Sequence, residues 1–203
     1  MIIRKEEEKD YFEVENLVRE AFWNVYRPGC FEHYVLHNFR NKDNFVKDLD
    51  YIIEDDGKIV AQIMYAMAKI TTDDGHIIPL LVLGPVGVLP SLQRKGYGKA
   101  IINFTLDKAK ELGFGAVALM GSPDYYPRFG FKPASSFNIY YEGMDRNVDA
   151  PFFMIKELKD GFLSGVSGVY SDPVEYNVDE KDVDEFDKKF PPKVKEKNEN
   201  QLG

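Results

Sequence analysis

The feature that most constrains this sequence is an apolar run that stops at a proline and leads directly into a glycine-containing helix start. The run from Leu80 to Leu89 ends at Pro90, and Gly96 and Gly98 then open an amphipathic stretch. Backbone amides at the start of a helix have no partner inside the helix, and the helix dipole gives them partial positive charge. Glycines remove the side chains that would keep a phosphate from these amides. The stretch therefore predicts a pyrophosphate cradle after a buried strand.

Two cations stand beside these glycines, and neither of two common phosphate-binding patterns fits the stretch. Arg94 and Lys95 would be ordinary surface charge in most proteins, but next to the glycines they favour an anion site. The P-loop pattern requires a glycine five residues before Gly98 and a Ser or Thr directly after Lys99, and neither is present. The dinucleotide pattern fails because Ile101 stands where its third glycine belongs.

A pattern that does fit is Gln-x-x-Gly-x-Gly, which runs from Gln93 to Gly98 after the apolar strand. It resembles motif A of the GNAT superfamily of acetyl-CoA-dependent N-acetyltransferases. The stretch from Tyr125 to Phe131 is similar to the Tyr-x-x-x-Gly-Phe segment of that family, in a form that resembles a bacterial subgroup of predicted acetyltransferases. Two matches in the family's order are more specific than either alone. The resemblance covers residues 1 to 157 in element order.

The resemblance implies acetyl-CoA as the cosubstrate and assigns roles to the strand before the cradle and to one tyrosine. Backbone groups of Val86 and Val88 would pair with the pantetheine arm where this strand leaves its neighbour. Tyr126 would be the general acid that protonates the CoA thiolate. Packing of Tyr126 among aromatic side chains, or a role for Tyr125 in its place, are open alternatives. The implied cofactor-binding residues are Val86, Gly87, Val88, Gln93, Arg94, Lys95, Gly96, Tyr97, Gly98 and Lys99.

No residue is assigned as the general base. Many family members use a Glu or Asp on the third or fourth strand, but residues 77 to 88 contain no carboxylate. Gly121 to Asp124 also stand in place of an Asn that contacts the pantetheine arm in the family, so that contact is left open. Acids in turns, such as Asp73, are usually turn formers. The conceivable bases are Glu54, Asp73, Asp74, His76, Asp124 and Glu142.

Metal chemistry and a cysteine nucleophile are both disfavoured by the sequence. His33 and His37 have the spacing of metal ligands on one helix face, but no third ligand is evident, which favours helix packing. Cys30 lacks the signature of a partner base and is interpreted as a small buried apolar group. We therefore expect no metal.

Length, composition and charge set the class of protein. The chain has 203 residues, 44% hydrophobic residues and one cysteine, which suits one domain or one domain with an appendage. A single cysteine excludes an internal disulfide framework and indicates a reducing compartment. Without a signal-peptide core or a membrane-length apolar run, we expect a cytoplasmic protein with no membrane partner. The net charge of −8 argues against nucleic acid and favours cationic substrates such as amines.

Three functional hypotheses follow. The first is an acyltransferase of the N-acetyltransferase class, which moves the acetyl group of acetyl-CoA to a primary amine by direct attack in a ternary complex. The second, motivated by the missing strand carboxylate, is a non-catalytic module that binds CoA or acyl-CoA for regulation. The third is a phosphate-binding domain for another nucleotide. Whether the amine belongs to a small molecule or a peptide is left open, as is a homodimer formed through an exposed edge strand.

Hydrophobic periodicity and turn residues predict an α/β fold. Asp10 and Glu13 have capping-box spacing at a first helix, and Gly113 is placed to end a later one. Gly84 and Pro85 predict a bulge or splay within a strand. Helices are expected at residues 11 to 25, 31 to 39 and 96 to 112. Strands are expected at residues 1 to 4, 51 to 54, 59 to 71, 76 to 88, 116 to 120, 137 to 141 and 152 to 158.

These elements predict a mixed, mostly antiparallel sheet that is splayed between its fourth and fifth strands and flanked by helices on both faces. Residues 1–170 are expected to form the acetyltransferase domain. Residues 171–203 are expected to form an acidic C-terminal extension, with a short helix at 179 to 190 and a disordered tail from residue 193.

Overall fold

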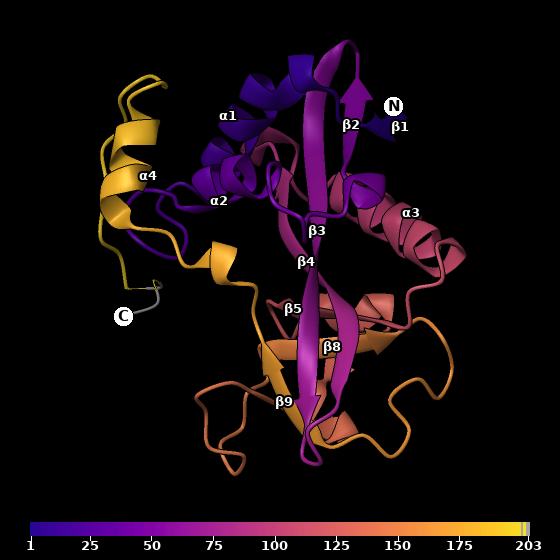
Figure 1. Ribbon diagram of the computed structural model, residues 1–203. Coiled ribbons are helices and arrows are strands. Elements are labelled where there is room, and N and C mark those ends of the chain that lie inside the picture. Colours follow the sequence, from indigo (N-terminus) through magenta and orange to yellow (C-terminus); the bar gives the residue numbers. More distant parts are fainter. Residues whose placement is uncertain (200, 202–203) are drawn as a thin grey trace. The chain divides into compact units, whose positions relative to one another are not determined.

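The computed structural model describes residues 1–199 and 201, and its contacts divide the chain into two compact units. Unit 1 comprises Met1–Met64, Pro85–Ile101 and the described part of Val174–Gly203, and unit 2 comprises Tyr65–Gly84 and Ile102–Pro173. Strands β3 (Lys58–Thr72) and β4 (Ile77–Val88) continue from one unit into the other, as does helix α3 (Tyr97–Glu111) (Figure 1). None of the helices in the described residues is long and apolar enough to cross a membrane.

Unit 1 contains an antiparallel ladder and the remaining helices. Strand β1 (Ile2–Lys5) pairs with β2 (Tyr51–Asp55), and β2 pairs with the first part of β3. Helix α1 packs against β4 at Gly87, where an added Cβ would lie 3.1 Å from Leu17 Cδ2. Gly87 therefore permits a close approach of helix to strand. The helices are α1 (Tyr11–Phe22), α2 (Glu32–Phe39) and α4 (Glu180–Asp187).

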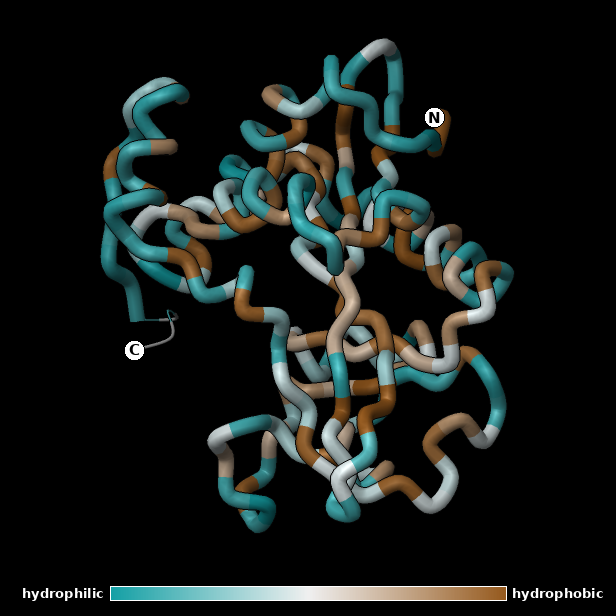
Figure 2. Tube along the Cα trace, in the orientation of Figure 1, coloured by the Kyte–Doolittle hydropathy of each residue, from teal (hydrophilic) through white to brown (hydrophobic). Residues whose placement is uncertain are grey.

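Unit 2 contains two sets of paired strands. In the first, β4 is parallel to β5 (Ala116–Met120), β5 is antiparallel to β8 (Phe153–Glu157), and β8 is antiparallel to β6 (Lys132–Pro133). In the second, the later part of β3 is antiparallel to β9 (Gly168–Ser171), which is parallel to β7 (Ile139–Tyr141). Hydrophobic and hydrophilic stretches both occur along these strands (Figure 2). Helix α3 is joined to β3 by a buried 2.9 Å hydrogen bond between Tyr65 Oη and Thr105 Oγ1.

The predicted fold class is confirmed: the strands are mostly antiparallel, β4 and β5 are parallel, and helices flank the strands. The ladder between β4 and β5 consists of the pairs Leu81–Val117 and Val82–Ala118. Gly84 follows with a φ of 138°, so β4 departs from regular geometry where the sequence predicts a splay.

The first helix begins at Tyr11 as predicted, but its end and its capping contacts differ from the prediction. It ends at Phe22 rather than Val25, because Trp23 takes a ψ of 120° and Asn24 a φ of 59°. Asp10 does not cap it, since the Arg4 guanidinium holds the Asp10 carboxylate at 2.6 Å and the Glu7 amide donates to it at 3.0 Å. Glu13 does not complete a capping box either; its Oε1 accepts a 3.2 Å hydrogen bond from the Ile59 amide.

The C-terminal segment belongs to unit 1 and is bound to α1. Helix α4 lies within the predicted span, and Asp179 caps it by accepting a hydrogen bond from the Lys181 amide. The fully buried Arg19 pairs with Asp187 of α4 at 2.5 Å. In the tail expected to be disordered, the Val194 carbonyl accepts 2.9 and 3.1 Å hydrogen bonds from the side chains of Trp23 and Asn24. The boundary expected at residue 170 falls inside β9.

Candidate functional site

The predicted cradle is a loop with unpaired amides at the start of α3. A 3₁₀ turn, Pro90–Leu92, follows β4, and the first hydrogen bond of α3 runs from the Ala100 amide to the Gly96 carbonyl at 2.9 Å. Within the described residues, the amides of Tyr97, Gly98 and Lys99 donate no hydrogen bond. Such amides are the donors that anions accept at helix starts.

The backbone of this loop is held in an uncommon conformation. Arg94 has a φ of 63°, which is rare for a residue with a Cβ, and Gly96 has a φ of 97°. Apart from Gly96 and its chain neighbours, no atom of the described residues lies within 4 Å of the position that a Cβ on Gly96 would take, so the φ angle and not crowding requires glycine there. Backbone strain of this kind is concentrated at ligand-binding sites.

The loop is strongly cationic and two of its side chains are already engaged. Residues 89 to 100 contain three cations and no acid, in a chain of net charge −8. Tyr97 Oη donates a 2.5 Å hydrogen bond to Asp55. The Met1 ammonium is the main cause that lowers the pKa of Asp55, and the bond from Tyr97 is the second. Gln93 Nε2 donates to the Val88 carbonyl at 3.3 Å. The Tyr97 side chain is therefore bonded to Asp55, and Tyr97 contributes its backbone amide to the cradle. The Gln93 side chain connects the loop to β4.

The end of β4 presents backbone groups on the side away from β3. The Leu89 amide donates to the Val60 carbonyl of β3 at 3.0 Å. Successive residues of a strand face opposite neighbours, so Val86 and Val88 direct their backbone groups away from β3. The Val88 carbonyl, which by this alternation faces away from β3, accepts the bond from Gln93. An extended ligand could pair with these groups as an added strand.

Tyr126 lies over the residue that follows β5. A Cβ on Gly121 would lie 2.3 Å from Tyr126 Cε2, and the Tyr126 ring meets the Phe131 ring edge-on at 5.9 Å. Tyr126 thus packs against an aromatic side chain, as one of the two alternatives expected. Its role as a general acid stays a prediction. The neighbouring Tyr125 carries the Arg128 guanidinium 4.7 Å from its ring centre, and burial raises the pKa of Tyr125.

Several conceivable bases are occupied by structural contacts. Asp73 pairs with Arg146 at 2.5 Å and accepts a hydrogen bond from Ser167, which together lower the pKa of Asp73 to about 2. A carboxylate with so low a pKa is a weak base. Glu54 pairs with Arg4 at 3.1 Å. Asp74, His76, Asp124 and Glu142 lie on the exposed surface.

Asp172 is the residue of interest that sequence reasoning missed. Its carboxylate accepts hydrogen bonds from the phenols of Tyr141 and Tyr170. The sequence carries no signal for this contact, because Asp172 lies beyond the domain end expected at residue 170 and no motif includes it.

The disfavoured nucleophile and metal ligands have structural partners. Burial raises the pKa of Cys30, whose thiol contacts Glu32, as expected for a buried apolar group. Burial also lowers the pKa of His33 to about 4, and His33 lies 3.1 Å from Asp187. In the described part of the chain, no group of three or more His, Cys, Asp or Glu residues is arranged to hold a metal ion.

Comparison with known proteins finds relatives along most of the chain. A family model described as "Acetyltransferase (GNAT) domain" matches residues 2–134. YhbS of Escherichia coli (strain K12), named an uncharacterized N-acetyltransferase, is 25% identical over 179 residues, which are 87% of this chain and 96% of YhbS. YjhQ of the same strain, named in the same way, is 29% identical over 105 residues, 51% of this chain and 52% of YjhQ.

Two solved structures share the fold. The crystal structure of Escherichia coli YhbS in complex with CoA has a TM-score of 0.75 at 22% identity and covers 87% of this chain and 92% of that one. A GNAT family acetyltransferase from Brucella melitensis in complex with acetyl-CoA has a TM-score of 0.68 at 24% identity and covers 86% of this chain and 97% of that one. Since the family model spans more than half of the sequence, this chain belongs to the GNAT family of acetyltransferases.

Proposed function

We propose that this protein transfers the acetyl group of acetyl-CoA to a primary amine by direct attack within a ternary complex. The observation that carries the proposal is the start of α3, where the amides of Tyr97, Gly98 and Lys99 have no acceptor in the described chain and stand among cations. Membership of the GNAT family and relatives solved with CoA and acetyl-CoA support the same cosubstrate.

Each part of the cosubstrate has a matching group on this chain. The three amides receive the pyrophosphate, and Arg94 and Lys95 add charge-assisted contacts. The backbone of Val86 and Val88 pairs with the amides and carbonyls of the pantetheine arm. Gln93 keeps the loop fixed to β4 through its hydrogen bond to Val88.

The chemistry then requires one proton donor near the sulfur. The neutral amine nitrogen forms a bond to the acetyl carbon while the carbon–sulfur bond breaks, and the electron pair leaves with the thiolate. Tyr126 gives its phenol proton to that thiolate and regains one, through solvent, from the acetylated nitrogen. A phenol of pKa about 10 is matched to this task, because the thiolate is comparably basic.

The absence of a carboxylate from β4 favours one alternative, a module that binds CoA without turnover. Incubation with acetyl-CoA and a panel of amines, followed by detection of free thiol, separates the two. Amine-dependent thiol release that falls in Tyr126→Phe supports the enzyme. Tight CoA binding with no thiol release from any amine, and no change in Tyr126→Phe, supports the module.

A further inference from the structure

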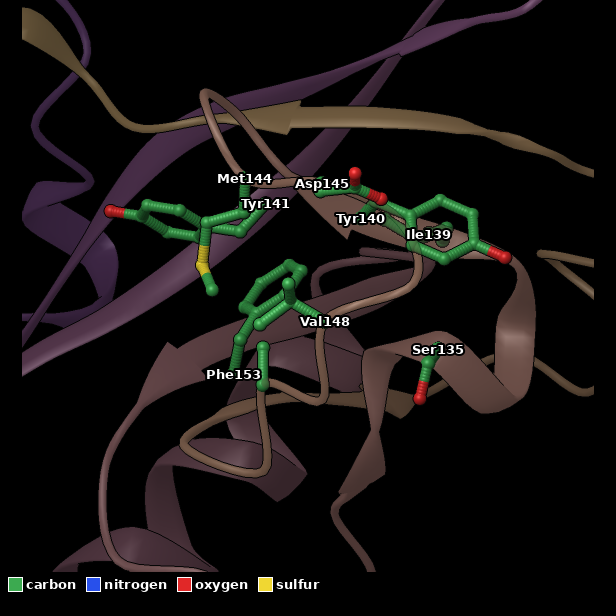
Figure 3. A pocket seen from close by; sticks show the side chains of 9 residues that line it. Ser135, Ile139, Tyr140, Tyr141, Met144, Asp145, Val148 and Phe153 are labelled. Carbon is green, nitrogen blue, oxygen red and sulfur yellow. The ribbon is translucent and has the colours of Figure 1, made fainter.

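The cavity beside Tyr141 and Phe153 in unit 2 is too small to hold a substrate. Its volume is about 20 Å³, room for one water molecule, and Val148 is among the side chains that line it (Figure 3). A cavity of this size takes neither an amine nor a nucleotide. The cradle at the start of α3 lies in unit 1, and so does the hairpin of β2 and β3 that contacts it.

Tyr97 is the cradle residue whose side chain is bonded to another element. Among residues 94 to 99, all of which the structure describes, only Tyr97 forms a side-chain hydrogen bond or ion pair. Gly96 and Gly98 stand on either side of it, and glycine leaves the backbone freer than any other residue does. Amides that must converge on one anion lose affinity if the backbone has to be ordered on binding. The Tyr97 side chain is therefore placed to remove that freedom in advance.

Asp55 accepts this bond from a fixed position. It is the last residue of β2, and a tight turn formed by Asp56 and Gly57 joins it directly to β3, with φ angles of 47° and 71° that are typical of two-residue hairpins. The Tyr97 phenol donates to Asp55 Oδ2 at 2.5 Å, and the Met1 nitrogen lies 2.7 Å from Oδ1. The bond to Asp55 raises the pKa of Tyr97, which keeps the phenol protonated. The hairpin thus holds the carboxylate, and the carboxylate holds the phenol.

The charge of Asp55 by itself does not favour an anion. Residues 89 to 100 contain three cations and no acid, which suits a pyrophosphate. An acid that is bonded to this loop repels the same pyrophosphate, so its charge alone weakens binding. A favourable effect of Asp55 on binding must then come from its bond to Tyr97. The two contributions have opposite signs, and substitution can separate them.

We infer that Asp55 is a positioning residue for the cosubstrate. Through the Tyr97 phenol it holds the first turn of α3, so that the amides of residues 97 to 99 meet the pyrophosphate together. The inference rests on the proposed function and extends it to a residue outside the glycine-containing loop. Asp55 acts on the binding of acetyl-CoA and not on the chemical step, because the pyrophosphate takes no part in the reaction.

Binding and turnover test the inference separately. Calorimetry with CoA measures binding, and thiol release from acetyl-CoA with the panel of amines measures KM and kcat. Asp55→Ala and Tyr97→Phe should each raise the dissociation constant for CoA and the KM for acetyl-CoA about 10-fold, the effect of losing one hydrogen bond to a charged group. We expect kcat to stay within about twofold of the wild type, because only uniform binding is lost. Since both variants break the same bond, the double variant should weaken binding no more than either one.

Asp55→Asn separates position from charge. Asparagine can face the phenol with its oxygen or with its amide, and a phenol both donates and accepts, so the bond is kept while the charge is removed. We expect Asp55→Asn to bind CoA at least as tightly as the wild type. Asp48→Ala is the matched control for the loss of an acid, because Asp48 pairs with Lys5 of β1 at 2.5 Å in the same unit. It should leave CoA binding unchanged.

The outcomes distinguish this inference from the proposed function. Unchanged or tighter CoA binding in Asp55→Ala, or additive losses in the double variant, overturns the inference, and amine-dependent thiol release by the wild type would leave the proposed function intact. If Asp55→Ala does not fold, Tyr97→Phe and Asp55→Asn decide in the same way. If CoA binding follows the expected pattern but no amine yields thiol, the positioning role stands and the transferase proposal fails. Absence of CoA binding to the wild type overturns both.

Discussion

Substitution of Gly121 by alanine should displace Tyr126 without altering any group that performs chemistry. A Cβ at Gly121 would lie 2.3 Å from Tyr126 Cε2 and 2.8 Å from Cδ2, whereas ordinary contacts begin near 3.4 Å. The ring must therefore move by roughly 1 Å, and a displacement of that size at a reacting group costs about 100-fold in rate, or ~2.7 kcal/mol of barrier. We expect kcat to fall by this factor and the KM for acetyl-CoA to change little.

The chain provides a matched control at the other end of β5. At Gly115, directly before the strand, a Cβ would lie 2.3 Å from the Phe162 ring, so Gly115→Ala introduces the same clash with a different aromatic side chain. Urea denaturation of both variants measures the cost to stability, and single-turnover thiol release measures the chemical step. The expected result is a similar loss of stability in the two variants and a loss of kcat in Gly121→Ala alone.

Two results would refute this reasoning. Unchanged kcat in Gly121→Ala, with a normal circular dichroism spectrum, would mean that the position of the Tyr126 ring does not matter for turnover. An equal fall in kcat in Gly115→Ala would mean that the loss reflects a general disturbance of β5.

Three further predictions concern the cradle, the C-terminal segment and a buried acid. The double variant Arg94→Gln, Lys95→Gln should raise the KM for acetyl-CoA several-fold and weaken its dependence on salt; a KM that responds to neither change would contradict the cradle. Asp187→Asn removes the negative charge that pairs with the fully buried Arg19 at 2.5 Å and should cost about 3–5 kcal/mol of unfolding free energy in urea titrations. Burial, and after it the neighbouring Glu6, raises the pKa of Asp50 in the folded protein. The folded state therefore binds the Asp50 proton more tightly than the unfolded state does. The stability that this proton contributes is lost as the pH rises above the pKa of Asp50 in the unfolded state. Asp50→Asn should therefore gain stability relative to the wild type as the pH rises above about 4, and a constant difference would exclude this linkage.

Features decided by neighbours in sequence could be predicted, and features decided by distant partners could not. Gly96 and Gly113 bound α3 as expected, because a helix start and a helix end depend on residues within one turn. Asp10 has the right residue type to cap α1, but Arg4 of a neighbouring strand takes its carboxylate. Asp172 finds Tyr141 31 residues earlier, through the parallel pairing of β7 with β9. A cluster formed by strand pairing leaves no local pattern to detect.

Backbone groups alternate in direction along β4, so its last residues divide into those that face β3 and those that face away from it. Gly87 packs closely against α1, since a Cβ there would lie 3.1 Å from Leu17 Cδ2. Leu89 faces β3 through its bond to Val60, so Gly87, two residues earlier, is expected to face β3 as well. Residues on either side of Gly87 must then face the other way, because the orientation of backbone groups reverses at every residue of a strand. Val86 and Val88 are therefore the positions from which β4 can offer its backbone to the pantetheine arm. The small residue between them lets α1 approach closely enough to hold the strand in place.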